Sequence, residues 1–283
     1  MTENMKQNTV LVTSATGKTG RRVAQRLTES GVAVRAGSRK AGTGPGEAVL
    51  DWESPATWGP ALEGVDAACV AYYPDLAYPG AVDAMRGFGR AAAEAGVGRL
   101  VLLSGRGEPE AVAAESALRE SGVDLTVVRA AFFAQNFSEG ALADGVAHGV
   151  IPFPAGGTAE PFIDADDLAE VMVVALTGEG HAGRTYEVTG PRLVTFDEAA
   201  AEITRATGRE VRYAPVSEEE FRGMLPALGF SEPEAAWLAG LFAMLMDGHN
   251  QSVTEDVRRV LGREPKDFRE FALDTASAGA WAR

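Results

Sequence analysis

A glycine-rich octapeptide, TSATGKTG at residues 13–20, is the segment whose composition is best suited to bind an anion. It stands between an apolar run typical of a strand and an amphipathic stretch typical of a helix. Its two glycines let the backbone approach a ligand closely, and a helix N-terminus carries the partial positive charge that suits a diphosphate. We therefore expect the turn to hold a dinucleotide, the alternative being a turn of structural use only. The residues expected to contact the ligand are Ser14, Thr16, Gly17, Lys18, Thr19 and Gly20.

Basic residues follow the second predicted strand. Folds that bind NAD usually carry Asp or Glu about 20 residues beyond the glycine turn, where the carboxylate binds the ribose hydroxyls. Here the segment 34–40 is VRAGSRK and holds no acid. Its cations and hydroxyl suit a 2′-phosphate, so we expect NADP, with a solvated basic turn as the alternative. The residues expected at this phosphate are Arg35, Ser38, Arg39 and Lys40, and those expected beside the adenine are Asp51 and Trp52.

The elements that must position these residues alternate along the first half of the chain. Short β-branched or apolar runs are separated by amphipathic stretches, which is the pattern of a parallel sheet with crossover helices. This order predicts an α/β fold with a doubly wound parallel sheet, in which ligands bind at the carboxyl ends of the strands. Strands are expected at Thr9–Ser14, Val32–Ala36, Glu47–Leu50, Val65–Tyr72, Arg99–Ser104 and Asp124–Arg129, and helices at Arg21–Ser30, around 82–92 and at Ala111–Ser121.

The second half of the chain is less regular. Its Pro- and Gly-containing stretch Ile151–Gly157 predicts a loop, and after Ser217 the pattern is almost wholly helical. Helices are expected at Asp166–Leu176, Thr195–Thr207 and Ser252–Gly262, and short strands at Thr185–Val188 and Glu210–Ala214.

The composition of the whole chain narrows the classes of partner. Its 283 residues are 46% apolar and carry 26 Lys and Arg against 40 Asp and Glu, a net charge of −14. Such a charge repels phosphate backbones, so nucleic acid and anionic membranes are not expected as partners. The one cysteine, Cys69, fits a reducing compartment. The apolar run Trp237–Met246 has ten residues and is too short to span a bilayer, and we see no secretory signal, so we expect a cytoplasmic protein.

Several segments of the chain resemble the atypical short-chain dehydrogenase/reductases of the NmrA-like kind, a family that includes quinone and azo-dye reductases. They are TSATGKTGRR at 13–22, AEAGVGRLVLLS at 93–104, ESALRESGVDLTVVRAAFFAQNF at 115–137, FIDADDLAEV at 162–171 and YEVTGPRLVTFDEAA at 186–200. The chain departs from the family pattern at Ser14, where the family has Gly, and at Ala130, where it has Pro.

The resemblance implies two lobes and a set of cofactor contacts. A Rossmann lobe that binds NADP(H) is expected over 1–135, completed by segments around 160–190. A smaller, mainly helical lobe that binds the substrate is expected over 136–160 and 191–283. The resemblance also implies that Ala71, Ser104 and Ala131 contact the cofactor.

The set of residues that would supply a proton to the substrate is incomplete. Better-known short-chain enzymes donate it from the Tyr of a Tyr-x-x-x-Lys helix, supported by a Ser to which Ser104 corresponds. Residues 79–185 contain no Tyr, however, and residues 41–265 contain no Lys. Positioned proton transfer contributes roughly 10²- to 10⁴-fold to rate, so an active enzyme needs a replacement. Three remain open: the side chain of Tyr72 or Tyr73, a water relay through Ser104, or internal proton transfer in a ketone with a neighbouring phenol.

The expected substrate is an aromatic polycyclic ketone or a quinone-like small molecule, a class implied by triad-lacking NmrA-like reductases of antibiotic tailoring. Its apolar pocket is expected to be lined by Tyr73, Phe132, Phe133, Asn136, Phe153, Trp237 and Leu241, with Met244 or Met246. The alternative for the residues of the apolar run Trp237–Met246 is that they belong to the ordinary hydrophobic core and contact no substrate. A different class of function is a dinucleotide-binding sensor that has lost catalysis and regulates a partner protein. The missing Tyr and Lys favour the sensor, and the apolar last lobe favours the enzyme.

No metal site is expected. Asp164, Asp166 and Asp167 open a predicted helix, and acids stabilise its positive end. The histidines at 148, 181 and 249 have no second ligand at helical spacing. The segment SEEE at 217–220 predicts a helix cap and a solvated face.

Overall fold

The computed structural model describes residues 8–40, 44, 46–140 and 142–281. The chain divides into two units, which we call the sheet unit and the second unit. The sheet unit comprises Met1–Ala130 and Leu168–Glu187, and the second unit comprises Ala131–Asp167 and Val188–Arg283.

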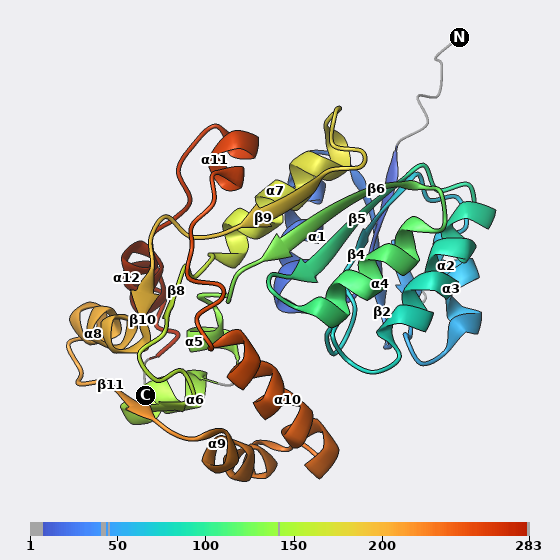
Figure 1. Ribbon diagram of the computed structural model, residues 1–283. Helices are drawn as coiled ribbons and strands as arrows, with labels where there is room; N and C mark the ends of the chain where they lie inside the picture. Colours follow the sequence, from blue (N-terminus) through green and yellow to red (C-terminus); the bar gives the residue numbers. More distant parts are fainter. Residues whose placement is uncertain (1–7, 41–43, 45, 141, 282–283) are drawn as a thin grey trace. The chain divides into compact units, whose positions relative to one another are not determined.

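A seven-stranded sheet forms the centre of the sheet unit (Figure 1). Its order is β3-β2-β1-β4-β5-β6-β9, and each adjacent pair from β3 to β6 is parallel. The order reverses between β1 and β4, so the doubly wound sheet is confirmed. The strands are β1 Thr9–Val12, β2 Ala33–Ser38, β3 Glu47–Val49, β4 Ala67–Val70, β5 Arg99–Gly105, β6 Asp124–Ala130 and β9 Thr185–Val188.

Helices cover both faces of this sheet. In Figure 1, α2, α3 and α4 lie on one face and α1 and α7 on the other. Every residue of β4 is buried, as expected for a strand covered on both sides. Burial also raises the pKa of the Cys69 thiol in β4 to about 12, which leaves it unreactive. The helices are α1 Lys18–Glu29, α2 Trp58–Leu62, α3 Ala81–Glu94, α4 Pro109–Arg119 and α7 Ala165–Thr177, with a 3₁₀ turn at Pro55–Thr57.

The second unit is mainly helical and is built around phenylalanines. Two small sheets accompany its helices: β8 pairs with β10 antiparallel, and β7 pairs with β11 in parallel. Phe153 and Phe196 stack with ring centroids 4.8 Å apart, and Phe162 packs edge-on against Phe196 at 5.4 Å. The elements are α5 Asn136–Glu139, α6 Ala143–His148, β7 Val150–Phe153, β8 Ala159–Glu160, β10 Val194–Thr195, α8 Phe196–Thr207, β11 Arg212–Pro215, α9 Glu218–Met224, a 3₁₀ turn at Leu225–Leu228, α10 Glu232–Leu245, α11 Asp256–Leu261 and α12 Phe268–Ser277.

Two sequence predictions in the second unit are wrong. The stretch predicted as a loop begins with β7, because Ile151 pairs with Tyr213 of a distant strand. The helix predicted from Ser252 begins only at Asp256, because the Thr254 backbone N–H donates instead to the Thr189 hydroxyl at 3.0 Å. The predicted helix cap at Ser217 is confirmed as a reciprocal capping box with Glu220.

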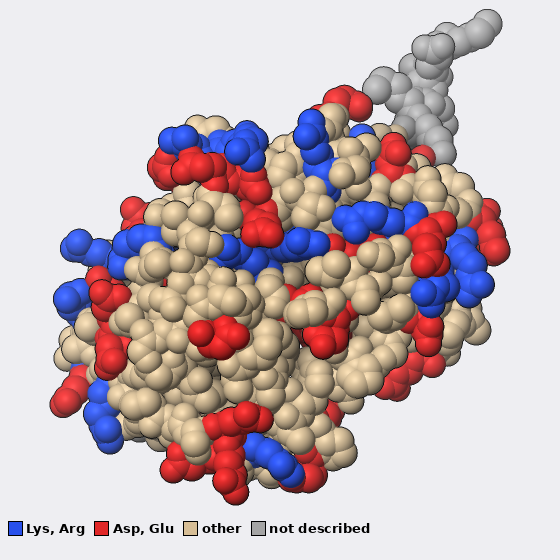
Figure 2. Space-filling model, in the orientation of Figure 1, with Lys and Arg blue, Asp and Glu red and all other residues tan. Residues whose placement is uncertain are grey.

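Charged side chains of both signs are interspersed over the face shown in Figure 2. On that face the acidic side chains behind the net charge of −14 therefore do not form one continuous acidic patch. Among the described residues, no helix is both long enough and apolar enough to cross a membrane.

Candidate cofactor site and active site

The glycine-rich turn joins β1 to α1 at the edge where the strand order reverses. Helix α1 begins after Gly17, a residue without a side chain to cap it, and its first turn holds no acid. The Gly17 N–H donates to the Ser14 carbonyl at 2.8 Å. A Cβ on Gly20 would overlap the Ser14 carbonyl oxygen and lie 2.9 Å from its carbonyl carbon. The turn is thus closed against the helix, whose positive end is left without a carboxylate of its own and fits a diphosphate.

Ser14 fixes this turn to the end of β4. Its φ of 49° is left-handed, a conformation that costs a residue with a side chain about 1–2 kcal/mol. Its hydroxyl donates to the Ala71 carbonyl at 2.9 Å, and the Thr13 hydroxyl donates to the same oxygen at 3.0 Å. The Ala71 N–H in turn donates to the Thr13 hydroxyl at 2.7 Å. Serine can therefore replace the family's glycine here because its side chain gains a hydrogen bond across the strand-order switch.

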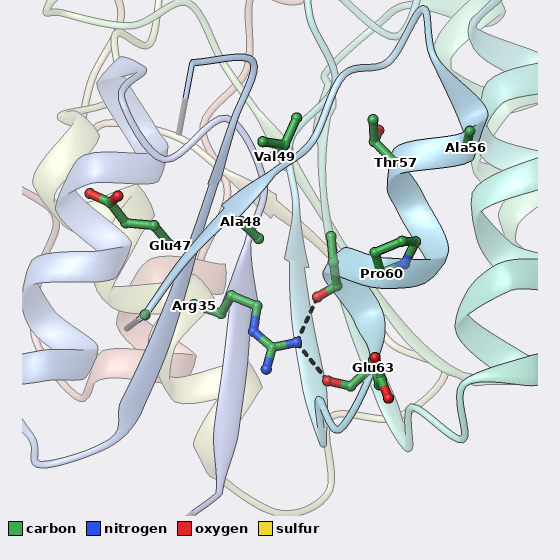
Figure 3. Close-up of a pocket in the computed structure, with 10 residues that line it drawn as sticks. Arg35, Glu47, Ala48, Val49, Ala56, Thr57, Pro60 and Glu63 are labelled. Carbon is green, nitrogen blue, oxygen red and sulfur yellow. Dashed lines mark hydrogen bonds between the residues drawn. The ribbon is translucent and has the colours of Figure 1, made fainter. Parts of the chain in front are cut away.

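Of the residues predicted to bind a 2′-phosphate, Arg35 points away from Ser38 and Arg39. Ser38 ends β2 and Arg39 follows it, with the Arg39 guanidinium 5.4 Å from the centre of the Tyr73 ring. Arg35 points elsewhere, as Figure 3 shows: it donates to the backbone carbonyls of Ala61 at 3.0 Å and Glu63 at 2.6 Å. The reason is that Arg35 lies inside β2, and its guanidinium satisfies carbonyls at the C-terminal end of α2.

Arg35 also lines an open pocket of about 650 Å³ between β3 and α2 (Figure 3). The lining also includes Ala48, Pro60 and Glu63. None of the residues predicted for the diphosphate lines this pocket, so it is separate from the glycine-rich turn.

The residues predicted beside the adenine are engaged within the sheet unit. The Trp52 ring is only 9% exposed and packs 5.1 Å from both Phe88 and Tyr72, centroid to centroid. The Asp51 carbonyl accepts a hydrogen bond from the Trp58 indole at 2.9 Å. Trp52 is therefore a residue of the hydrophobic core, and the structure does not leave its ring faces open to an adenine.

The predicted proton donors differ in environment. Burial, with the charge of Glu53, raises the pKa of Tyr72, whose ring rests against Trp52, so Tyr72 is a weaker acid than an exposed tyrosine. Tyr73 is 61% exposed. Ser104 is buried and donates its hydroxyl hydrogen to the Glu115 carboxylate at 2.7 Å.

Glu115 is the centre of a buried ionic network in the place of the missing Tyr-x-x-x-Lys motif. Arg129 donates to both of its carboxylate oxygens, each at 2.8 Å. Burial acts to raise the pKa of Glu115, but the hydrogen bonds from Arg129 and Ser104 outweigh it, and the pKa is lowered. Glu115 is thus ionised and holds the Ser104 proton, so Ser104 can accept a hydrogen bond from a ligand more readily than it can donate one.

Sequence reasoning missed three acids around α4: Glu115, and the paired carboxyl groups of Asp75 and Glu108. Glu115 lies in the helix predicted at Ala111–Ser121, where nothing in the spacing indicates Arg129 as an ionic partner. Glu108 lies before that predicted helix, and the Pro109 that follows it is a signal for a helix start but not for a partner of Glu108.

Of the residues predicted to contact the substrate, those in the second unit are either part of the hydrophobic core or partly buried. The Phe132 ring lies 5.6 Å from Phe153 and 5.8 Å from Phe242, centroid to centroid. Phe153 is fully buried and therefore belongs to the core rather than to an open wall. The predicted residues that keep partial exposure are Phe132, Phe133, Asn136, Trp237, Leu241 and Met244, whereas Met246 is buried. Ala131 follows β6, and its N–H donates to the Val188 carbonyl at 3.0 Å.

The acids that open α7 have structural partners. Asp164 accepts a hydrogen bond from the Asp166 N–H at 2.7 Å, which is helix capping. Asp167 is paired with Arg263 at 2.7 Å and accepts from the Lys266 N–H at 2.6 Å. Within the described part of the chain, no group of three His, Cys, Asp or Glu side chains is placed to hold a metal ion.

Comparison with known proteins gives consistent matches over nearly the whole chain. A family model described as NAD(P)H-binding matches residues 14–179. The chain is 34% identical to (4-alkanoyl-5-oxo-2,5-dihydrofuran-3-yl)methyl phosphate reductase of Streptomyces griseus subsp. griseus, over 96% of this chain and 99% of that protein. It is 32% identical to NAD(P)H azoreductase of Xenophilus azovorans, over 95% and 98%. Its fold matches that of Citrobacter sp. triphenylmethane reductase complexed with NADP(H), with a TM-score of 0.78 and 24% identity over 94% of this chain and 99% of that one.

Proposed function

This chain belongs to the NAD(P)H-binding family, and we propose that it is an NmrA-like, atypical short-chain dehydrogenase/reductase that acts as an NADPH-dependent reductase of aromatic ketones or quinone-like molecules. The observation that carries the proposal is the start of α1, which has neither a side-chain cap nor an acid and is tied through Ser14 to the end of β4. Two relatives that are more than 30% identical over almost their full length are named as reductases.

We assign two parts of the cofactor, the diphosphate and the 2′-phosphate, to residues of the sheet unit. The backbone of the turn from Thr16 to Gly20 would receive the diphosphate at the α1 N-terminus. Ser38 and Arg39, at the end of β2, would bind the 2′-phosphate, without Arg35. The strand order then leaves the nicotinamide half for the ends of β4 and β5, where Ala71 and Ser104 lie. When bound there, the cofactor supplies a hydride.

The substrate class follows from the side chains available to it. Phe132, Phe133, Trp237 and Leu241 offer partly exposed apolar surface, which suits a flat polycyclic ligand. Within this class we propose a tailoring ketoreductase of aromatic polyketide antibiotics as the finer assignment.

Cofactor preference provides the first test. We expect the wild type to bind NADPH more tightly than NADH, as measured by quenching of tryptophan fluorescence, and to oxidise NADPH in the presence of menadione or 1-tetralone. Arg39→Ala should weaken NADPH binding by roughly 10- to 150-fold and leave NADH binding unchanged, since a charge-assisted bond is worth about 1.5–3 kcal/mol. Arg90→Ala, an exposed change on α3, is the matched control. A wild type that binds neither nucleotide would refute the proposal.

A non-catalytic sensor of the NADP(H) ratio is the second candidate. It is favoured by the Ser104 hydroxyl being committed to Glu115 and by the lack of Tyr and Lys in α4. Tight NADPH binding without oxidation by any ketone or quinone would support the sensor over the reductase.

A further inference from the structure

The carboxyl groups of Asp75 and Glu108, which the proposed cofactor contacts do not use, lie beyond the ends of β4 and β5. Asp75 lies in the segment that leaves β4, and Glu108 is the residue before α4 in the segment that leaves β5. The two strands are paired in parallel, with Val70 opposite Leu102, so their carboxyl ends share one edge. The carboxyl groups of Asp75 and Glu108 lie within interaction distance, and each shifts the pKa of the other. Because ionised carboxylates only accept hydrogen bonds, a hydrogen bond between the two requires that one of them carry a proton.

Glu108 is the member whose surroundings favour the neutral acid. It is 6% exposed, and its Oε2 receives no hydrogen bond from any N–H or hydroxyl group of the described residues. It stands at the N-cap of α4, yet its side chain accepts no capping bond. A Cβ on Gly105 would overlap the Glu108 carboxyl group, so the acid packs directly against the last residue of β5.

The charges that face this pair are negative. Burial, the charge of Asp75 and the charge of Glu110 together raise the pKa of Glu108 to about 9. Burial also raises the pKa of Asp75, but the Ala77 N–H, at 2.8 Å from Oδ1, and a hydrogen bond from Glu108 act in the opposite direction. At neutral pH, therefore, Glu108 holds the proton and Asp75 is the acceptor.

We propose that Glu108 is the proton donor of the reduction and that Asp75 is the residue that positions it. This inference rests on the proposed function, because it assumes that a carbonyl group is reduced beside the ends of β4 and β5. The carbonyl carbon receives the hydride, and the electron pair of the C=O π bond moves to the oxygen. That oxygen takes the proton from the Glu108 carboxyl group, which gives an alcohol, oxidised cofactor and a Glu108 carboxylate. Water then returns a proton to Glu108, because two adjacent anions repel.

Two of the other donors considered at this edge are less able to fill the role. The Ser104 hydroxyl hydrogen is committed to an ionised acceptor, and the Tyr72 phenol is made less acidic by burial. Glu108, by contrast, holds a proton at neutral pH and has a pKa of about 9, below the ordinary tyrosine value of about 10, so it releases its proton more readily than a phenol does.

The direct test compares Glu108→Gln with Glu120→Gln, an exposed change at the C-terminal end of the same helix. With NADPH and either menadione or 1-tetralone, Glu108→Gln should lower kcat by about 10²- to 10⁴-fold. Its Kd for NADPH, measured by fluorescence, should stay within about twofold of the wild-type value, and so should kcat of the Glu120→Gln control.

A pH profile separates proton donation from a structural role. The wild-type kcat should fall as the pH rises through about 9, because Glu108 loses its proton there. In Asp75→Asn the neighbouring negative charge is gone, so the pKa of Glu108 should drop and the fall in kcat should move to lower pH. A merely structural contact would leave this limb of the profile in place.

A third readout needs neither cofactor nor turnover. A carboxyl group whose pKa is raised on folding loses protons first from the unfolded chain, so wild-type stability should decline between about pH 5 and pH 9. Glutamine does not ionise, so the melting temperature of Glu108→Gln minus that of wild type should become more positive across this range. A difference that stays constant with pH would contradict a protonated Glu108.

The outcomes distinguish this inference from the proposed function. Wild-type turnover in a folded Glu108→Gln that binds NADPH overturns the donor role and leaves the reductase proposal standing. A wild type that binds NADPH but reduces neither compound overturns the reductase proposal and the donor role with it. If Glu108→Gln does not fold, the Asp75→Asn profile decides, and an unshifted alkaline limb overturns the inference.

Discussion

Replacing Gly20 by alanine tests whether the glycine-rich turn holds the cofactor. The added Cβ would overlap the Ser14 carbonyl oxygen and lie 2.9 Å from the Ser14 carbonyl carbon and 3.0 Å from the Ala15 Cα. Carbon atoms in contact prefer about 3.5–4.0 Å, so the backbone of the turn must move away from α1 by more than half an ångström. Backbone, unlike the end of a flexible side chain, cannot rotate out of the way.

The two consequences of this clash differ in size. Overpacking costs about 1–3 kcal/mol, and alanine recovers up to about 1 kcal/mol of helix propensity, so the net loss of stability should be about 1–2 kcal/mol. Displacement of the turn also moves the amides that would receive the diphosphate, and the loss of one hydrogen bond to a charged group costs about 1.5–3 kcal/mol, which is roughly 10- to 150-fold in Kd. The expected result for Gly20→Ala is therefore a folded protein whose Kd for NADPH is raised by roughly 10- to 150-fold.

Fluorescence titration with NADPH and urea unfolding measure these two quantities separately. The matched control is Gly59→Ala in α2, where the added Cβ meets no atom within 4 Å. That variant should bind NADPH as the wild type does and unfold at equal or slightly higher urea concentration. Wild-type affinity in Gly20→Ala would refute the assignment of the diphosphate to this turn.

Two further substitutions test the contacts that support the site. Arg129→Met should lower the free energy of unfolding by up to about 3–5 kcal/mol at neutral pH, because it leaves the buried Glu115 carboxylate with only the Ser104 hydroxyl and the more distant Arg119 guanidinium, at 3.7 Å, and protonation of Glu115 should reduce that loss as the pH falls towards 4. Urea unfolding at several pH values measures both effects, and a pH-independent loss would contradict an ionised Glu115. Ser14→Gly removes a left-handed strain of about 1–2 kcal/mol and a hydrogen bond to Ala71 worth about 0.5–1.5 kcal/mol, so its stability should stay within about 1 kcal/mol of wild type. A larger loss of stability would show that the Ser14 hydroxyl does more than offset its own backbone strain.

The sheet unit could be predicted from sequence because its signals are local. Most of its strands are short apolar runs that alternate with helices, and the glycine-rich turn stands at the first strand-to-helix junction. The short strands of the second unit could not be predicted in the same way. Four residues of β7 become a strand only because β11, some sixty residues later, pairs with them.

The candidate site shows how sensitive residue assignments are to the exact end of a strand. The second strand was predicted to end at Ala36, which would leave Arg35 near the ligand edge. In the structure β2 continues to Ser38, so Arg35 lies inside the strand and reaches the C-terminal end of α2. Trp52 shows a second difficulty, since composition does not distinguish an aromatic side chain of the core from one that flanks a ligand.

The two acids of the α4 region, Glu108 and Glu115, are of the same residue type, but burial and neighbouring charges give them different protonation states. A helix N-terminus favours the ionised form of a carboxyl group by about 0.3–1 kcal/mol, which is less than one pKa unit. Glu108 nevertheless has a pKa of about 9, because burial and the adjacent Asp75 outweigh the helix. Glu115, more deeply buried, remains ionised because Arg129 binds both of its oxygens. One carboxyl group thus holds the Ser104 hydroxyl in place while the other retains a proton, so a helix without Tyr or Lys still presents both a fixed anion and an acid.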